Sequence, residues 1–263
     1  MPVALLLVLP AAPLAVLGVQ ATSRGWFYPQ VLPREWTAEA VSRLVTDPGI
    51  RDALATGLVV SLAATTVAML LGVPAARALG MRRFPGRGLA LAVLALPLLV
   101  PPPAVGIGLN VAFLRAGLAG DTVGVVLAHL VPTVPYVVFP LLGAFARYDE
   151  GIELQARSLG AGPLTVAVRV SLPLLAPALA VAALFGFLAS WGQYTLTLLI
   201  GGGRVVTLPV LLVSTATGGD PAVAATLALA LAGPAVLAVA LAVRVARAVP
   251  VAAGGTQTDG GVR

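Results

Sequence analysis

Long apolar segments without charge constrain this chain more than any other feature of its sequence. The hydrocarbon core of a bilayer is ~30 Å thick and offers no partner to unpaired backbone groups, so a helix that crosses it needs about 20 apolar residues. Six segments meet this requirement, namely residues 1–20, 53–76, 88–114, 122–146, 172–200 and 221–243. The sequence therefore predicts an all-α, polytopic membrane protein with six transmembrane helices.

The other segments divide the chain into regions. We expect residues 21–52 to form an external loop, residues 53–250 to form the core transmembrane domain, and residues 251–263 to form a disordered tail. The apolar stretch 205–217 is short and carries several polar residues, which favours an interfacial or re-entrant piece over a seventh crossing. Because no Lys or Arg precedes the first segment, we expect a retained signal anchor rather than a cleaved signal peptide.

The charged residues are few, and their kinds exclude several functions. Charged residues make up 10% of the chain, whereas a soluble domain has about a quarter. All 16 cationic residues are arginine, so the lysine that a GxxxxGK[ST] phosphate-binding loop requires is missing, and the chain is not expected to be an ATPase. One histidine, no cysteine and no HExxH or GxSxG motif argue against enzymatic activity and against a metal site. We expect no cofactor bound by this chain. We also expect no nucleic-acid partner, because arginines scattered between apolar segments reflect membrane topology and not a binding patch.

The arginines also predict the orientation of the chain in the membrane. If both termini are cytoplasmic, ten arginines lie inside and six lie outside. The short inner loop between the second and third segments holds Arg82, Arg83 and Arg87 next to the membrane. Short cytoplasmic loops are enriched in such residues, so we predict a multi-pass protein of the cell inner membrane with both termini in the cytoplasm.

The cytoplasmic segment 147–172 has the signals of a short helix. Asp149 can cap its amino end, Glu150 and Glu153 fall in the first turn where the helix dipole favours anions, and Gly160 can adopt the left-handed conformation that ends a helix. The sequence predicts a helix of about two turns with an apolar stripe. The alternative interpretation is an amphipathic connector that rests on the membrane surface.

The spacing within this segment resembles the EAA loop of permease subunits in binding-protein-dependent ABC importers of type I. In that loop E-A-A is followed by three residues, a glycine, nine residues and I-x-L-P. Ala156, Gly160, Val170, Leu172 and Pro173 fall in register, whereas Leu154 and Gln155 replace the usual Glu and Ala. Segments 72–75 and 190–192 also resemble the family, so the resemblance covers roughly residues 53–243.

The resemblance implies a partner for the cytoplasmic helix. In this family the loop docks on a separate ATPase, which uses ATP and Mg, while a second permease subunit, the same or homologous, and an extracytoplasmic solute-binding protein complete the complex in the lipid bilayer. The departure at Leu154 and Gln155 suggests that docking here depends more on the apolar face and on Arg157. Pro173 would begin the fifth transmembrane helix. The residues that we assign to ATPase coupling are Glu153, Leu154, Gln155, Ala156, Arg157, Leu159, Gly160, Leu172 and Pro173.

Polar residues within the apolar segments are candidates for the substrate path, because each is costly in lipid unless it is paired or faces a cavity. The fifth segment has the densest group, Trp191, Gln193, Tyr194 and Thr197. The other candidates are His129 and Asn110, although a lone histidine in a helix is more often a packing or interhelical hydrogen-bonding residue than a ligand, and Asn110 has the same ambiguity. Residues 101–103 are three consecutive prolines, which should break the third segment near the middle of the membrane.

The resemblance leaves the substrate open among thiamine, polyamines, ferric iron and oxyanions. Two other functions compete with an ABC permease. An ion-coupled secondary transporter would show internal repeats and intramembrane acids, and neither is evident. A membrane scaffold without transport activity would not need a proline-broken helix or a polar cluster within its spans.

Overall fold

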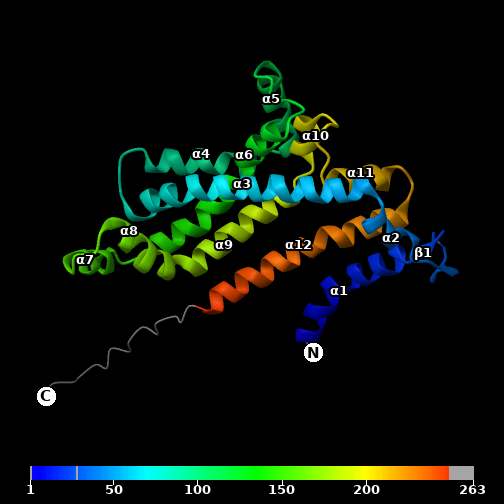
Figure 1. The fold of residues 1–263 in the computed structure, drawn as a ribbon, viewed down its shortest axis with the longest axis horizontal. Helices are drawn as coiled ribbons and strands as arrows, with labels where there is room; N and C mark the ends of the chain where they lie inside the picture. Colours follow the sequence, from blue (N-terminus) through cyan, green and yellow to red (C-terminus); the bar gives the residue numbers. More distant parts are fainter. Residues whose placement is uncertain (1, 28, 249–263) are drawn as a thin grey trace.

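The computed structural model describes residues 2–27 and 29–248, and their fold is almost entirely helical. Four long helices, α3 (Pro48–Met81), α6 (Thr122–Phe145), α9 (Leu172–Trp191) and α12 (Pro221–Ala248), run side by side and form the bundle in Figure 1. The one sheet within the described part is a hairpin of two antiparallel strands of two residues each, β1 (Ser23–Arg24) and β2 (Glu35–Trp36). The predicted all-α class is therefore confirmed, while the predicted tail, residues 251–263, lies outside the described residues.

Apolar helices long enough to cross a membrane occupy most of the predicted segments. Single helices of this kind cover Pro48–Met81, Thr122–Phe145, Pro163–Trp191 and Pro221–Arg247, and a bent pair supplies a fifth candidate span. The predicted first span is helical as α1 (Pro2–Ala21), which packs mainly against α12. The described residues thus contain four or five candidate spans by length and composition, and the count of six stays a prediction.

The second predicted span begins earlier than the apolar pattern suggested. Asp47 accepts a hydrogen bond from the backbone N–H of Gly49 at 2.8 Å, and Pro48 occupies the first position of α3, where its missing N–H costs nothing. The expected external loop therefore includes the first turn of α3 as well as the hairpin and α2 (Glu39–Thr46). The capping signal at residues 47–48 takes precedence over the two charged residues that follow it, Arg51 and Asp52.

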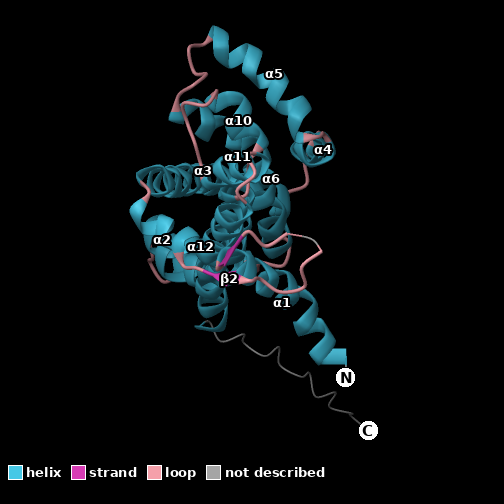
Figure 2. Cartoon of the chain, turned by 90° about the vertical axis from the view of Figure 1, so that its right-hand side faces the viewer, coloured by secondary structure: helices cyan, strands magenta, loops and turns pink. Residues whose placement is uncertain are grey.

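The third predicted span is broken, as its prolines indicated. Helix α4 (Arg87–Leu99) and helix α5 (Pro102–Arg115) meet at an angle of 103°, and Val100 between them is extended. Pro102 and Pro103 cannot donate the hydrogen bonds that would continue α4. Figures 1 and 2 show that α5 projects from the bundle and lies beside α10 (Thr195–Gly201).

The prediction that Pro173 begins the fifth span was wrong. The helix begins at Pro163 with α8 (Pro163–Val166), passes through a π-helical turn η1 (Ala167–Ser171) and continues as α9. In the wide turn, the N–H of Leu172 donates to the carbonyl of Ala167. A π-type turn accommodates an interrupted hydrogen-bond ladder, so the helix passes Pro173, which has no N–H, without ending. The predicted span 172–200 ends early as well, because a break after Trp191 separates α9 from α10.

Close packing of α3, α6 and α9 forms the centre of the bundle. Glycines allow the approach, because a Cβ atom on Gly72 would lie 2.7 Å from Cγ1 of Val137 and one on Gly186 would lie 2.9 Å from Cγ2 of the same residue. Small residues at helix interfaces are typical of membrane bundles, where van der Waals contact replaces the hydrophobic effect as the driving force. The stretch 205–217 forms the short helix α11 (Leu208–Thr217), which is consistent with the predicted short piece.

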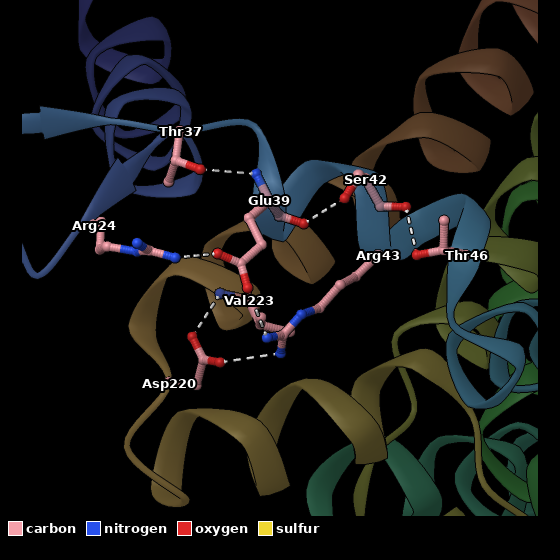
Figure 3. A network of polar contacts seen from close by, with 8 residues as sticks. All are labelled: Arg24, Thr37, Glu39, Ser42, Arg43, Thr46, Asp220 and Val223. Carbon is pink, nitrogen blue, oxygen red and sulfur yellow. Dashed lines mark hydrogen bonds and ion pairs between the residues drawn. The ribbon is translucent and has the colours of Figure 1, made fainter.

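A network of charged side chains joins the hairpin, α2 and α12 at the end of the bundle opposite α7 (Glu150–Ser158) (Figure 3). Arg24 Nη2 lies 2.5 Å from Glu39 Oε2, and Arg43 contacts both Glu39 at 3.5 Å and Asp220 at 3.4 Å. Hydrogen bonding and charge from Arg24 lower the pKa of Glu39. Asp220 also caps α12 by accepting from the N–H of Val223 at 3.1 Å. Arg43 therefore connects the loop before α3 to the start of α12.

Candidate functional site

The predicted cytoplasmic helix is present as α7, which projects with α8 from one end of the bundle (Figure 1). Asp149 accepts from the N–H of Gly151 at 2.8 Å, which confirms the predicted cap. Gly160 has φ +87°, the N–H of Gly160 donates to Arg157 O at 2.9 Å, and that of Ala161 donates to Ala156 O at 3.1 Å. This pair of bonds around a left-handed glycine is a Schellman motif, so both ends of α7 are fixed by local sequence.

One side of α7 is open to solvent and partly apolar. The exposed fraction is 39% for Ile152, 62% for Leu154 and 88% for Leu159. Gln155 and the side chain of Arg157 are also exposed, and Ala156 is half-buried. Leu154 and Gln155, which differ from the usual motif, thus lie on the accessible side. An exposed helix of this kind is suited to contact a partner.

Glu153 lies on the opposite side of α7 and is buried, with 4% of its surface exposed. Arg77 Nη2 of α3 donates to Glu153 Oε2 at 2.7 Å, and Ser171 Oγ of η1 donates to Glu153 Oε1 at 2.7 Å. Tyr148, in the linker before α7, donates to Ser171 Oγ at 3.1 Å. Arg157, one turn along α7, has its nearest nitrogen 3.9 Å from Glu153 Oε2. Unlike its exposed neighbours on α7, Glu153 faces α3 and η1.

The hydrogen bond from Arg77 is the main reason that the pKa of Glu153 falls to about 2, although burial opposes the change. A carboxylate whose pKa is lowered on folding stabilises the folded state above its unfolded pKa of 4.5, and this contribution is lost as the pH falls toward 2. Burial raises the pKa of Tyr148 in the same cluster. Glu153 therefore stays charged at physiological pH.

The two halves of the sequence motif meet through Ser171. Glu153 and Ser171 are 18 residues apart and are joined by the hydrogen bond between their side chains. Leu172 follows with 51% exposure and Pro173 is exposed as well, so the residue before the Leu-Pro pair makes the contact. Sequence reasoning missed Arg77, Tyr148 and Ser171 as site residues. An arginine near the end of an apolar helix was the available signal for Arg77.

A second cluster of polar side chains lies inside the bundle, around His129. His129 is 1% exposed, with Nδ1 at 2.8 Å from Ser190 Oγ and Nε2 at 2.9 Å from Thr197 Oγ1. Thr197 donates its single hydroxyl proton to Gln193 O at 2.8 Å, so His129 Nε2 must carry a proton and donate, and Nδ1 accepts from Ser190. His129 thus joins α6 to both sides of the break between α9 and α10.

The remaining candidates for the substrate path are more scattered. Trp191 stacks on Phe187 with ring centroids 5.8 Å apart and donates to Leu231 O of α12 at 2.8 Å, so it packs between helices. Gln193 lines a small cavity of about 20 Å³ that lies between the break from α4 to α5 and the break from α9 to α10. Tyr194 and Asn110 are half-buried, and among the described residues neither forms a side-chain hydrogen bond. The structure brings His129, Gln193 and Thr197 together but does not place Asn110 with them.

No group of three or more His, Cys, Asp or Glu side chains that would hold a metal ion occurs in the described ranges. The polar chemistry of both clusters is that of hydrogen bonding and ion pairing. Nucleophile and base pairs of the kind that enzymes use were not found in the sequence. The architecture is a bundle of long apolar helices with an exposed helix at one end.

Comparison with known proteins agrees with this class. Residues 45–250 match the family described as "Binding-protein-dependent transport system inner membrane component", and the chain belongs to this family. It is thus a multi-pass inner-membrane permease subunit of an ABC importer, and its family is one of transport permeases and not of catalytic enzymes. The resemblance seen in the sequence is confirmed.

Individual relatives and one solved structure resemble this chain over much of its length. The molybdenum transport system permease protein ModB of Mycobacterium tuberculosis is 35% identical over 213 residues, which cover 75% of this chain and 78% of ModB. The molybdate/tungstate transport system permease protein WtpB of Pyrococcus abyssi is 30% identical over 145 residues, or 55% of this chain and 58% of WtpB. A chain from the crystal structure of a bacterial ABC transporter involved in alginate import has a TM-score of 0.72, with 92% of both chains covered and 18% identity. That last likeness supports the fold alone.

Proposed function

We propose that this chain is the permease subunit of an ATP-driven importer of molybdate or tungstate. The observation that carries the proposal is the 35% identity to a molybdenum transport system permease over three quarters of the chain. WtpB, a molybdate/tungstate permease, supports the same cargo class. Of the cargoes that the sequence left open, these relatives favour the oxyanions.

The distribution of acidic residues is consistent with an anionic cargo. Residues 53–120, 122–148 and 154–219 contain no Asp or Glu, so the long helices of the bundle carry almost no fixed negative charge. Carboxylates along a path would repel a dianion, whereas neutral donors such as those around His129 and Gln193 would not. The same absence disfavours a secondary transporter coupled through intramembrane acids.

The proposed complex contains subunits other than this chain. Two ATPase subunits supply the energy from ATP and Mg, a second permease completes the pathway, and a solute-binding protein delivers the cargo from outside. The exposed side of α7 serves as the ATPase contact. The end of α3, the start of α4 and the end of α12 lie toward the end of the bundle where α7 projects (Figure 1). Arg82 follows α3, and Arg87 and Arg244 belong to α4 and α12, which supports six spans with both termini in the cytoplasm.

Transport by the reconstituted complex tests the proposal. The chain is purified with its companion ATPase and binding protein, placed in proteoliposomes, and supplied with ATP and radioactive molybdate. We expect uptake that requires ATP and binding protein and is inhibited by tungstate but not by thiamine, spermidine or ferric citrate.

Other outcomes assign the chain to the competing functions. Uptake that persists without ATP and follows an ion gradient indicates a secondary transporter. Purification without an ATPase, together with no uptake of any of these solutes, indicates a scaffold. Uptake of thiamine or iron in place of molybdate retains the permease class and refutes the cargo.

A further inference from the structure

We propose that Glu153 is a positioning residue that ties α7 to two helices of the bundle and thereby transmits the displacement of α7 into them. The proposal rests on the proposed function, in which α7 is the ATPase contact. It assigns a role within the chain to one acid of the cytoplasmic helix, and it makes Arg77 the partner on which that role depends.

Apolar packing does not hold α7 in place. Its apolar side chains Ile152, Leu154 and Leu159 are exposed, and its backbone packs mainly against α8 and η1. The ion pair between Glu153 and Arg77 is therefore its principal link to α3, the longest helix of the bundle. A helix held in this way depends on a few directional contacts.

The contacts of Glu153 are unusually complete for an acid in this protein. Among the described residues it is the only Asp, Glu or Arg that is buried. Each carboxylate oxygen has its own donor at 2.7 Å, Arg77 from α3 on one and Ser171 from η1 on the other. Charge-assisted hydrogen bonds of this length are strong and fix the orientation of the side chain. A buried acid that loses its partner strongly destabilises the folded state.

The two donors belong to helices that meet again in the centre of the bundle. Helices α3 and α9 pack on each other and on α6, with Val137 of α6 against Gly72 and Gly186. Helix α9 leads from Ser171 to Ser190, which binds His129 beside the break before α10. A displacement of α7 can thus reach the polar cluster along α9, while α3 carries it into the packed centre of the bundle.

Variants at Arg77 test the role of the pair without changing the exposed side of α7. Arg77→Met removes the donor, Arg77→Lys retains a charge, and Arg83→Met is the matched control, because Arg83 is exposed near the same helix end and no ion pair of it is found in the described part. Glu153→Gln, which keeps the shape of the side chain, serves as a milder second variant if Arg77→Met folds poorly. Each is reconstituted with the ATPase and binding protein.

Two measurements separate the positioning role from general stability. The first is the number of molybdate ions imported per ATP hydrolysed. The second is the distance distribution between spin labels on Leu70 of α3 and Ser158 of α7, which needs no cargo and is simple to label because the natural chain contains no cysteine. Both labelled positions are exposed.

The distance is measured on the labelled chain without the ATPase, because Ser158 lies on the exposed side of α7, and in the wild type we expect a narrow distribution. Arg77→Met should still bind the ATPase and hydrolyse ATP, but with a broad distance distribution and about a tenfold loss of molybdate imported per ATP, because the buried Glu153 loses the charged partner that ties α7 to α3. Arg77→Lys should recover most of the ratio, and Arg83→Met should match the wild type.

Two results would overturn the proposal. One is a distribution in Arg77→Met as narrow as in the wild type, and the other is a broad distribution with an unchanged ratio of transport to hydrolysis. If the wild-type complex hydrolyses ATP but imports another solute, the proposed cargo fails, and the ratio is then measured with that solute. If the wild type binds no ATPase, both proposals fail together.

Discussion

Gly160 shows how a single residue determines where α7 ends. Its φ of +87° places it in the left-handed region, and an added Cβ would meet nothing within 4 Å. The requirement for glycine is therefore conformational and not steric. Gly162 provides the contrast, because its φ of −70° suits any residue and its surroundings are equally open.

We expect Gly160→Ala to cost about 1–2 kcal/mol, the strain of a left-handed non-glycine residue. Gly160→Asn should cost less, since asparagine tolerates this conformation. Hydrogen exchange of the α7 amides in the purified chain is the measurement, with roughly tenfold faster exchange expected for the alanine variant. Gly162→Ala is the control, and an effect at residue 162 equal to that at residue 160 would refute the conformational explanation.

At this scale the sequence is informative about local contacts and silent about distant ones. The cap at Asp149 and the turn at Gly160 were predicted because each depends on residues within a few positions of itself. The bonds of Glu153 to Arg77 and of His129 to Ser190 span 76 and 61 positions, and nothing in either segment identifies the other. The interhelical hydrogen bonding of His129 was an open alternative that the structure supports.

At the scale of elements, Val137 is the point where three helices of the bundle meet. Gly72 of α3 and Gly186 of α9 each face one of its methyl groups. The backbones of α3 and α9 reach α6 because neither glycine carries a Cβ. The spacing of α3, α6 and α9 is therefore set by side-chain volume at a few positions.

Gly72→Ala should lower the stability of the bundle by about 1–3 kcal/mol, since the new methyl would lie 2.7 Å from Val137 Cγ1. Val137→Ala in the same chain should recover part of the loss by making room. Thermal unfolding in detergent, followed by tryptophan fluorescence, gives the comparison. Gly108→Ala is the matched control, because nothing lies within 4 Å of its added Cβ. Strictly additive effects of the two substitutions would contradict this account.

The boundaries of elements were harder to predict than their existence. The apolar pattern predicts helices at all six segments but misplaces the starts of the second and the fifth. Helix α3 begins at Pro48 after the cap at Asp47, and the fifth helix passes Pro173 through a π-type turn. The break at residues 101–103 was predicted correctly because three consecutive prolines cannot continue the hydrogen bonds of a preceding helix, although Pro102 and Pro103 can begin the next one. Hydropathy indicates which residues of a helix cross the membrane, whereas capping and backbone hydrogen bonds determine where the helix begins.

At the scale of the whole molecule, the two ends of the bundle are held together by different kinds of contact. Near α7 a buried carboxylate has two donors. At the opposite end, the pairs of Arg43 with Glu39 and Asp220 are 44–50% exposed (Figure 3). Salt screens exposed pairs far more than buried ones.

We therefore expect Arg43→Met to lower stability by no more than about 1 kcal/mol, the usual value of an exposed ion pair. Raising the salt concentration from about 0.05 to 1 M should accelerate hydrogen exchange in α2 and leave α7 unchanged. The variant should reduce the salt response of α2 but not abolish it, because the exposed pair between Arg24 and Glu39 remains, and this reduction is the internal control. A salt response in α7 as large as that in α2 would contradict the difference between the two ends.

Helix α1 has a consequence for how this family changes over evolution. It precedes the residues 45–250 that match the family, and it packs mainly on one face of α12. A helix attached at a single face is not threaded through the bundle, so its loss, replacement or extension requires no repacking of α3, α6 and α9. Lineages that share the same core are therefore free to diverge at the amino terminus, and new interactions can be acquired there without redesign of the transport machinery.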